Sequence, residues 1–172
     1  HRRGAALQRA GDAVNTAARV FATATLLLAA TLAQAGRSCE SKPPSAAAVQ
    51  QSMVLAETTA RLLDASGAQV VVLARAGQDL GAYGLRYSHL GLAYRDPAGW
   101  RVVHKLNQCG TARASVYRQG LGEFFLDDLY RYEAAAVVPT PEVQARLLPA
   151  LRDNARLAQL DTPAYSMVAY PW

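Results

Sequence analysis

The sequence predicts an α+β fold: a small antiparallel sheet built around one central hairpin and flanked by helices. The first observation is that the 172 residues, 51% of them hydrophobic and 18% charged, suffice for one folded domain with its own core. The second is that short segments, rich in β-branched residues or alternating in polarity, are separated by turn residues. The third is that two longer segments, near 46–64 and 141–157, carry apolar residues at helical spacing.

The first 35 residues differ in character from the rest. Residues 1–18 are predicted to be an upstream extension and residues 19–35 a signal peptide, because Arg19 precedes an apolar run followed by an Ala-Gln-Ala cleavage site that ends at Ala35. We expect an exported, periplasmic protein with no membrane span once this signal is removed. The alternative is an uncleaved amino-terminal anchor, although the apolar run is shorter than the ~20 residues that span a bilayer.

Residues 36–172 are predicted to form a single domain, which we expect to continue past Trp172, because the chain stops directly after an apolar segment. The formal net charge of +5 falls to +2 for this part, since the first 35 residues hold four arginines and one aspartate. No stripe of Lys and Arg interleaved with aromatics occurs, so we expect no nucleic-acid partner. We also expect no cofactor and no metal, because no Cys/His spacing of zinc-site type is present.

The domain is predicted to begin with a helix over residues 46–64, with Ser45 as its N-cap. Apolar residues at helical spacing predict the stripe that faces the core: Val49, Met53, Ala56, Ala60 and Leu63. A Ser-Gly pair ends this helix, and the β-branched segment 69–75 follows as a buried strand. The Gly-rich segment 77–84 is predicted to be a loop that does not bind phosphate, since no Gly-Lys-Ser or Gly-Lys-Thr follows.

Residues 88–106 predict the central hairpin. Its turn, Asp-Pro-Ala-Gly at 96–99, has Pro in the second and Gly in the fourth position, as type I turns favour. If Arg95 pairs with Trp100 across this turn, the chain's two internal histidines, His89 and His104, lie on the same face of the sheet, one diagonal step apart and within possible contact. A one-residue bulge would send them to opposite faces.

The remaining elements follow the hairpin. In order they are a helix over 111–118, a short helical segment over 123–126, a strand over 132–138, a helix over 141–157 and a strand over 165–169. The helix over 141–157 has Thr140 as its N-cap and Pro141 in its first position, where Pro is favoured.

The two histidines carry a local resemblance to a known family. The segments Ser-His-Leu-Gly at 88–91 and Val-Val-His at 102–104 resemble the His-bearing strand and the polar residue of the next strand in NlpC-type, papain-like cell-wall peptidases. The resemblance covers roughly residues 87–104. It implies that His89 is a catalytic base, that His104 orients it, and that the substrate is an amide in a cell-envelope peptide or peptidoglycan. Alternatively, both imidazoles are structural and hydrogen-bonded within the sheet.

Cys39 and Cys109 are the only cysteines, and two interpretations stay open. Cys109 is the candidate nucleophile, because it stands near the start of the predicted helix 111–118, where the helix dipole would favour a thiolate. It follows His104 by only five residues, and in permuted relatives the nucleophile comes on a later helix, here past the C-terminus. Alternatively, export favours a Cys39–Cys109 disulfide, which would exclude Cys109 as the nucleophile.

Longer segments of the chain carry a second resemblance. These segments are 77–80, 83–96, 100–117 and 120–133. Together they span most of residues 39–170, and they resemble the domain-of-unknown-function 2145 family of exported proteobacterial proteins, which brings no established activity. Two hypotheses therefore remain: a papain-like amide hydrolase or a degenerate relative of one, and a non-catalytic periplasmic structural or binding protein stapled by its two cysteines.

Overall fold

The computed structural model describes residues 43–108, 111, 113–127 and 129–163. The chain divides into two units, residues 1–38 and residues 39–172, and every described residue belongs to the second unit. The predicted signal peptide, both cysteines and the predicted strand over 165–169 lie outside the described residues.

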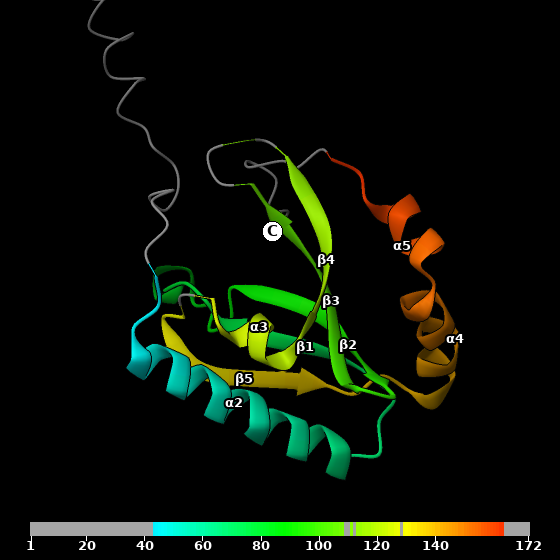
Figure 1. The fold of residues 1–172 in the computed structure, drawn as a ribbon, viewed down its shortest axis with the longest axis horizontal. Helices are drawn as coiled ribbons and strands as arrows, with labels where there is room; N and C mark the ends of the chain where they lie inside the picture. Colours follow the sequence, from blue (N-terminus) through cyan, green and yellow to red (C-terminus); the bar gives the residue numbers. More distant parts are fainter. Residues whose placement is uncertain (1–42, 109–110, 112, 128, 164–172) are drawn as a thin grey trace, which may run out of the picture. The chain divides into compact units, whose positions relative to one another are not determined.

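Among the described residues, strands form one antiparallel sheet in the order β4-β3-β2-β1-β5 (Figure 1). The strands are Val70–Ala76 (β1), His89–Asp96 (β2), Gly99–Asn107 (β3), Ala114–Gly120 (β4) and Arg131–Val137 (β5). The helices of this part are Ala46–Ala65 (α2), Leu121–Phe125 (α3), Pro141–Arg152 (α4) and Asn154–Leu160 (α5), with a 3₁₀ turn at Gly81–Tyr83 (η1). The architecture is α+β, as predicted.

Helices cover both faces of the sheet. The α2 face, which carries Ala93 and Val102, packs against α2 and α3 around the buried Phe124. The α4 face, which carries Tyr94 and Val103, packs against apolar side chains of α4 and α5. Figure 1 shows α2 running along one side of the sheet and α4 with α5 along another. Strand pleating therefore sends alternate residues of β2 and β3 into two separate cores.

The helix α2 begins where the sequence predicts, and the Ser45 hydroxyl accepts a hydrogen bond of 3.1 Å from the Ala48 N–H. Its buried side chains are Ser52, Ala56, Thr59 and Leu63. The predicted stripe is thus partly wrong, because Met53 is 40% exposed and Ser52 is buried in its place. Small side chains at these positions let the helix approach the sheet closely, and hydrophobicity alone does not reveal that preference.

The register of the β2–β3 hairpin is the predicted one. Arg95 pairs with Trp100, and the same register continues to Leu92 and Val103. Gly99 closes the turn with a φ of +117°, a backbone conformation that residues with a Cβ rarely adopt. The hairpin therefore brings His89 and His104 to the same face, which confirms that prediction.

The predicted helix over 111–118 is wrong, because residues 114–120 form β4, antiparallel to β3. Ala114 is buried whereas Tyr117 is 41% exposed, and pairing with β3 satisfies backbone groups that would otherwise be left at a sheet edge. A strand, not a helix, therefore follows Cys109 in the described part of the chain. The helix-dipole argument for a Cys109 thiolate no longer applies.

The predicted helix over 141–157 is divided into α4 and α5. Asp153 interrupts it in an extended conformation, and its carboxylate accepts hydrogen bonds from the N–H groups of Ala155 and Arg156 at the start of α5. Pro141 occupies the first turn of α4, as predicted. After this break, α5 contacts β4, the strand that carries Gln119.

Candidate functional site

His89, His104 and Gln119 form a hydrogen-bonded row across β2, β3 and β4. Nε2 of His89 lies 2.8 Å from Nδ1 of His104, and Nε2 of His104 lies 2.7 Å from Oε1 of Gln119. The two imidazoles meet edge to face, with ring centroids 5.1 Å apart. The strand register produces this row, because His104 pairs with Tyr117 on β4 and Gln119 is the next residue on the same face. We call these three side chains the histidine row.

The amide oxygen of Gln119 sets the direction of the hydrogen bonds in the histidine row. An amide oxygen only accepts, so Nε2 of His104 carries the hydrogen and donates it to Gln119. Nδ1 of the neutral His104 then accepts from Nε2 of His89. This arrangement leaves a lone pair on Nδ1 of His89, and that nitrogen is the one able to take a proton from another group.

Both imidazoles are held in their neutral form. Burial, followed by the positive charge of Arg75 and the neighbouring His104, lowers the pKa of His89 from 6.5 to about 4, and Asp127 opposes this shift. Burial is also the main cause that lowers the pKa of His104, while its hydrogen bond to Gln119 acts in the opposite direction. At neutral pH the row therefore presents an unprotonated base at His89.

A buried cation, Arg75, lies beside the histidine row. It pairs with His89 across β1 and β2 and is only 3% exposed. Its guanidinium donates to the carbonyl oxygen of Phe124 and, through Nη2, to Oδ2 of Asp127 at 2.5 Å. Its Cζ also lies 4.7 Å from the centroid of the Phe124 ring. Arg75 therefore ties α3 to the sheet and places a positive charge next to both imidazoles.

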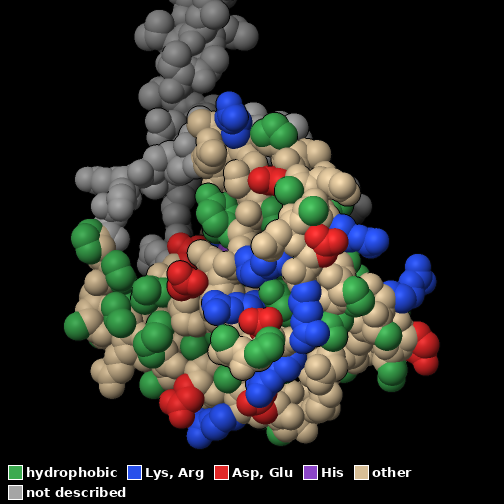
Figure 2. Space-filling model, turned by 45° about the vertical axis from the view of Figure 1, so that its right-hand side comes forward, with side chains coloured by type: hydrophobic (Ala, Val, Ile, Leu, Met, Phe, Trp, Pro, Cys, Tyr) green, Lys and Arg blue, Asp and Glu red, His purple; other side chains and the backbone are tan. Residues whose placement is uncertain are grey.

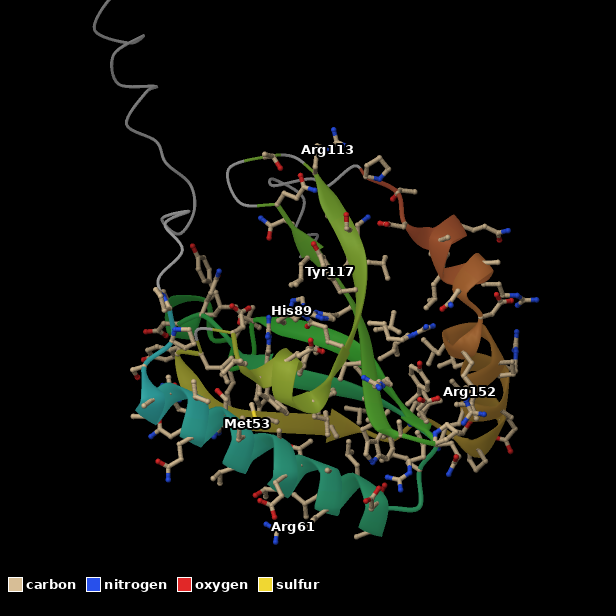
Figure 3. The ribbon with its side chains drawn as sticks, viewed as in Figure 1. Met53, Arg61, His89, Arg113, Tyr117 and Arg152 are labelled. Carbon is tan, nitrogen blue, oxygen red and sulfur yellow. The ribbon has the colours of Figure 1, made fainter. Side chains whose placement is uncertain are left out.

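Two aromatic side chains flank the histidine row. Phe124 is fully buried, and its ring centroid lies 5.1 Å from that of His104 and 6.0 Å from that of His89. Tyr117, whose ring centroid is 6.3 Å from that of His104, is exposed. Figure 3 shows His89 close to α3 and Tyr117 on β4. The row thus has an apolar wall on one side and a solvent-exposed aromatic on the other.

Sequence reasoning identified two members of this site and missed two others. Gln119 is missed because the segment before it predicts a helix, and residues 114–120 show no regular alternation of polar and apolar residues that would indicate a strand. Arg75 ends a predicted strand without a predicted role, although a cation at the end of an apolar strand is itself a signal. Among the described residues, no group of three or more His, Cys, Asp or Glu could hold a metal ion.

Comparisons with known proteins agree with the longer sequence resemblance. A family model described as an uncharacterized protein conserved in bacteria, DUF2145, matches residues 62–172, a range that contains the whole histidine row. Neither a curated protein nor a solved structure matches the chain. Within the described part of the chain, every helix is too short or too polar to cross a membrane.

Proposed function

The chain belongs to the DUF2145 family, and we propose that it is an exported envelope protein in which His89 and His104 serve a papain-like, NlpC-related amide hydrolase. The histidine row is the observation that carries this proposal. A papain-type site needs a histidine that takes a proton from a thiol, and a polar group on the next strand that orients this histidine. The hydrogen bond between His89 and His104 on neighbouring strands supports the assignment of these two roles, and Gln119 adds to it by fixing the tautomer of His104.

In the proposed reaction, a cysteine thiol passes its proton to Nδ1 of His89 as the sulfur bonds to the carbon of a substrate amide. His89 then gives the proton to the amide nitrogen, and the C–N bond breaks to leave a thioester and a free amine. Water adds to the thioester carbon while His89 takes and returns its proton. The carboxylic acid leaves, and the thiol is restored.

The low pKa of His89 fits this role only when the nucleophile is near. A shift from 6.5 to about 4 disfavours the imidazolium, so His89 alone would remain uncharged. An opposite charge within ~4–6 Å raises such a pKa by about 1–3 units. A thiolate at Nδ1 of His89 would therefore offset most of the shift, and proton transfer would be coupled to arrival of the sulfur.

The proposed location and substrate class go together. A signal peptide at residues 19–35 would deliver the domain to the cell envelope, where peptide amides of peptidoglycan are available substrates. Amino-terminal sequencing of the exported protein should give Gly36 as the first residue. A mature protein that retains the apolar run would contradict export by cleavage and leave an anchored protein instead.

The proposed activity is tested by measuring the reactivity of the cysteine thiols and the cleavage of a peptidoglycan substrate. The rate of alkylation by iodoacetamide across a range of pH reports thiolate formation, and mass spectrometry of purified muropeptides incubated with the protein reports amide cleavage. We expect one reactive thiol, and we expect His89→Gln to slow its alkylation near neutral pH and to abolish cleavage. Cys39→Ser and Cys109→Ser, made separately, identify which sulfur attacks.

Leu90→Ala is the matched control. Leu90 follows His89 on β2, is 60% exposed, and points away from the histidine row because successive residues of a strand alternate faces. It should leave both readouts unchanged. If the unreduced protein shows no free thiol after unfolding, and the folded protein cleaves no muropeptide, the two cysteines form a disulfide and the protein is the non-catalytic alternative.

A further inference from the structure

A second feature lies on the α4 face, away from the histidine row. It is a hollow of about 500 Å³ lined by Tyr94, Asp96, Pro97, Arg101, Arg118 and Arg152. We propose that this arginine hollow binds a phosphate-type oxyanion, either a small soluble phosphate ester or the phosphate of a lipid headgroup. The inference does not depend on the proposed hydrolase, because no residue of the histidine row lines the hollow.

The arginines of the hollow come from three different elements. Arg101 pairs with Tyr94 across β2 and β3, so both lie on the α4 face. Arg118 pairs with Val103, which places it on the same face of β4. Arg152 is the last residue of α4, and its Nη2 donates to the carbonyl oxygen of Arg95 at 2.7 Å. The sheet and the end of α4 thus present guanidinium groups to a common space.

The three guanidinium groups are engaged to different extents. Arg118 donates to the side-chain oxygen of Asn154 and to the carbonyl oxygen of Leu151, so it helps to hold the end of α4. Its Nε is nevertheless buried without a hydrogen-bond partner in the described part of the chain. The guanidinium of Arg101 makes no hydrogen bond or ion pair with any described residue. All five N–H donors of Arg101 are therefore available to a ligand.

The charge of the hollow favours an anion. Three arginines and one aspartate line it, which leaves a formal charge of +2. Figure 2, which turns the α4 side of the molecule forward, shows Lys and Arg side chains gathered on this face. Like charges that line one hollow repel each other, and a bound anion relieves this repulsion. A tetrahedral oxyanion offers acceptors in several directions and so suits donors that converge from three elements better than a planar carboxylate does.

The test is a titration of the whole chain with inorganic phosphate and with glycerol phosphate, followed by calorimetry or by backbone amide shifts. We expect saturable binding, with shifts in the residues that line the hollow. Arg101→Gln should weaken binding about tenfold or more, since it removes a charge-assisted hydrogen bond. Arg101→Lys keeps the charge but not the planar guanidinium, so its affinity should fall between that of the parent protein and that of Arg101→Gln. Because the guanidinium of Arg101 has no partner among the described residues, these variants should keep the melting temperature of the parent protein.

Arg61→Gln is the matched control, because it removes the same charge from α2, on the other side of the sheet (Figure 3). It should leave binding unchanged. Equal weakening by Arg61→Gln and Arg101→Gln would show attraction by net charge alone and overturn the proposal, as would the absence of saturable binding to every probe. Sedimentation with phosphatidylglycerol vesicles, compared with phosphatidylcholine vesicles, distinguishes a lipid headgroup from a soluble phosphate ester. Binding to phosphatidylglycerol vesicles that requires Arg101, without binding of the soluble phosphates, assigns the site to a lipid headgroup.

Discussion

Acid should destabilise this fold through His89 and His104. His89 has a pKa of about 4 in the folded protein against 6.5 for an unperturbed imidazole, and the pKa of His104 is lowered as well. Between these values the unfolded chain binds more protons than the folded one, so the free energy of unfolding rises with pH. The contribution of His89 is complete above about pH 6.5 and is lost as the pH falls toward about 4.

The magnitude follows from the size of the shift. The difference between 6.5 and about 4, at 1.36 kcal/mol per pKa unit, corresponds to about 3 kcal/mol if solvent does not screen the site. His89 is only half-buried, and solvent screens part of this energy, so we expect a loss of about 1–2 kcal/mol from His89. His104 adds to the loss in the same direction. Domains of this kind are stable by about 5–15 kcal/mol, so the effect is readily measured.

Urea unfolding followed by circular dichroism at pH values from neutral to about 4.5 measures this loss. The reference is a double variant, His89→Gln with His104→Gln, which has no imidazole to titrate in the site. Carboxylates with lowered pKa values, such as Asp79 and Glu133, lose their stabilising effect as the pH falls in both proteins and cancel in the comparison. The parent protein should lose more stability than the variant. Identical pH dependence of the two proteins would refute the burial argument, and so would an NMR titration of His89 near 6.5.

Three substitutions test the packing and the electrostatics around the histidine row. Gly91→Ala should cost about 1–3 kcal/mol in urea unfolding, because its Cβ would stand 2.6 Å from Cγ1 of Val102; unchanged stability would contradict the close strand approach. Phe124→Ala removes a fully buried ring and should cost about 3–5 kcal/mol by the same assay, whereas a loss below about 1 kcal/mol would mean that the site is not packed as described. Arg75→Met should raise the pKa of both histidines, which its charge now lowers; unchanged NMR titration curves would remove Arg75 from the electrostatics of the site.

The hairpin could be predicted from sequence because its determinants are local. The Asp-Pro-Ala-Gly turn sets which residues pair across β2 and β3, and a period of two then sets which side chains share a face. His89 and His104 follow from these two rules alone. The starts of α2 and α4 could be predicted for the same reason, since the Ser45 cap and Pro141 in the first helical position act within one turn of their own helices.

The rest of the site depends on contacts between segments that are distant in sequence. Residues 114–120 form a strand because the open edge of β3 is available to pair with them, and a local pattern does not reveal that edge. Arg75 meets Asp127 and the end of α3 across about 50 residues of chain, so its role appears only when the sheet is assembled. The core stripe of α2 likewise depends on how closely the helix approaches the sheet, which is why Ser52 is buried and Met53 is not.

The pleat of β4 places two adjacent residues with different roles, Gln119 and Arg118, on opposite faces of the sheet. Gln119 points to the α2 face and accepts from His104, while Arg118 points to the α4 face and lines the arginine hollow. A slip of one residue in the β3–β4 register would exchange them. A guanidinium has only donors, so Arg118 could not accept the hydrogen of His104, and its charge would further disfavour protonation of both imidazoles. Gln119 would meanwhile leave the hollow with one positive charge fewer. The register of this edge strand thus determines both the proton-accepting nitrogen of His89 and the charge of the hollow on the opposite face.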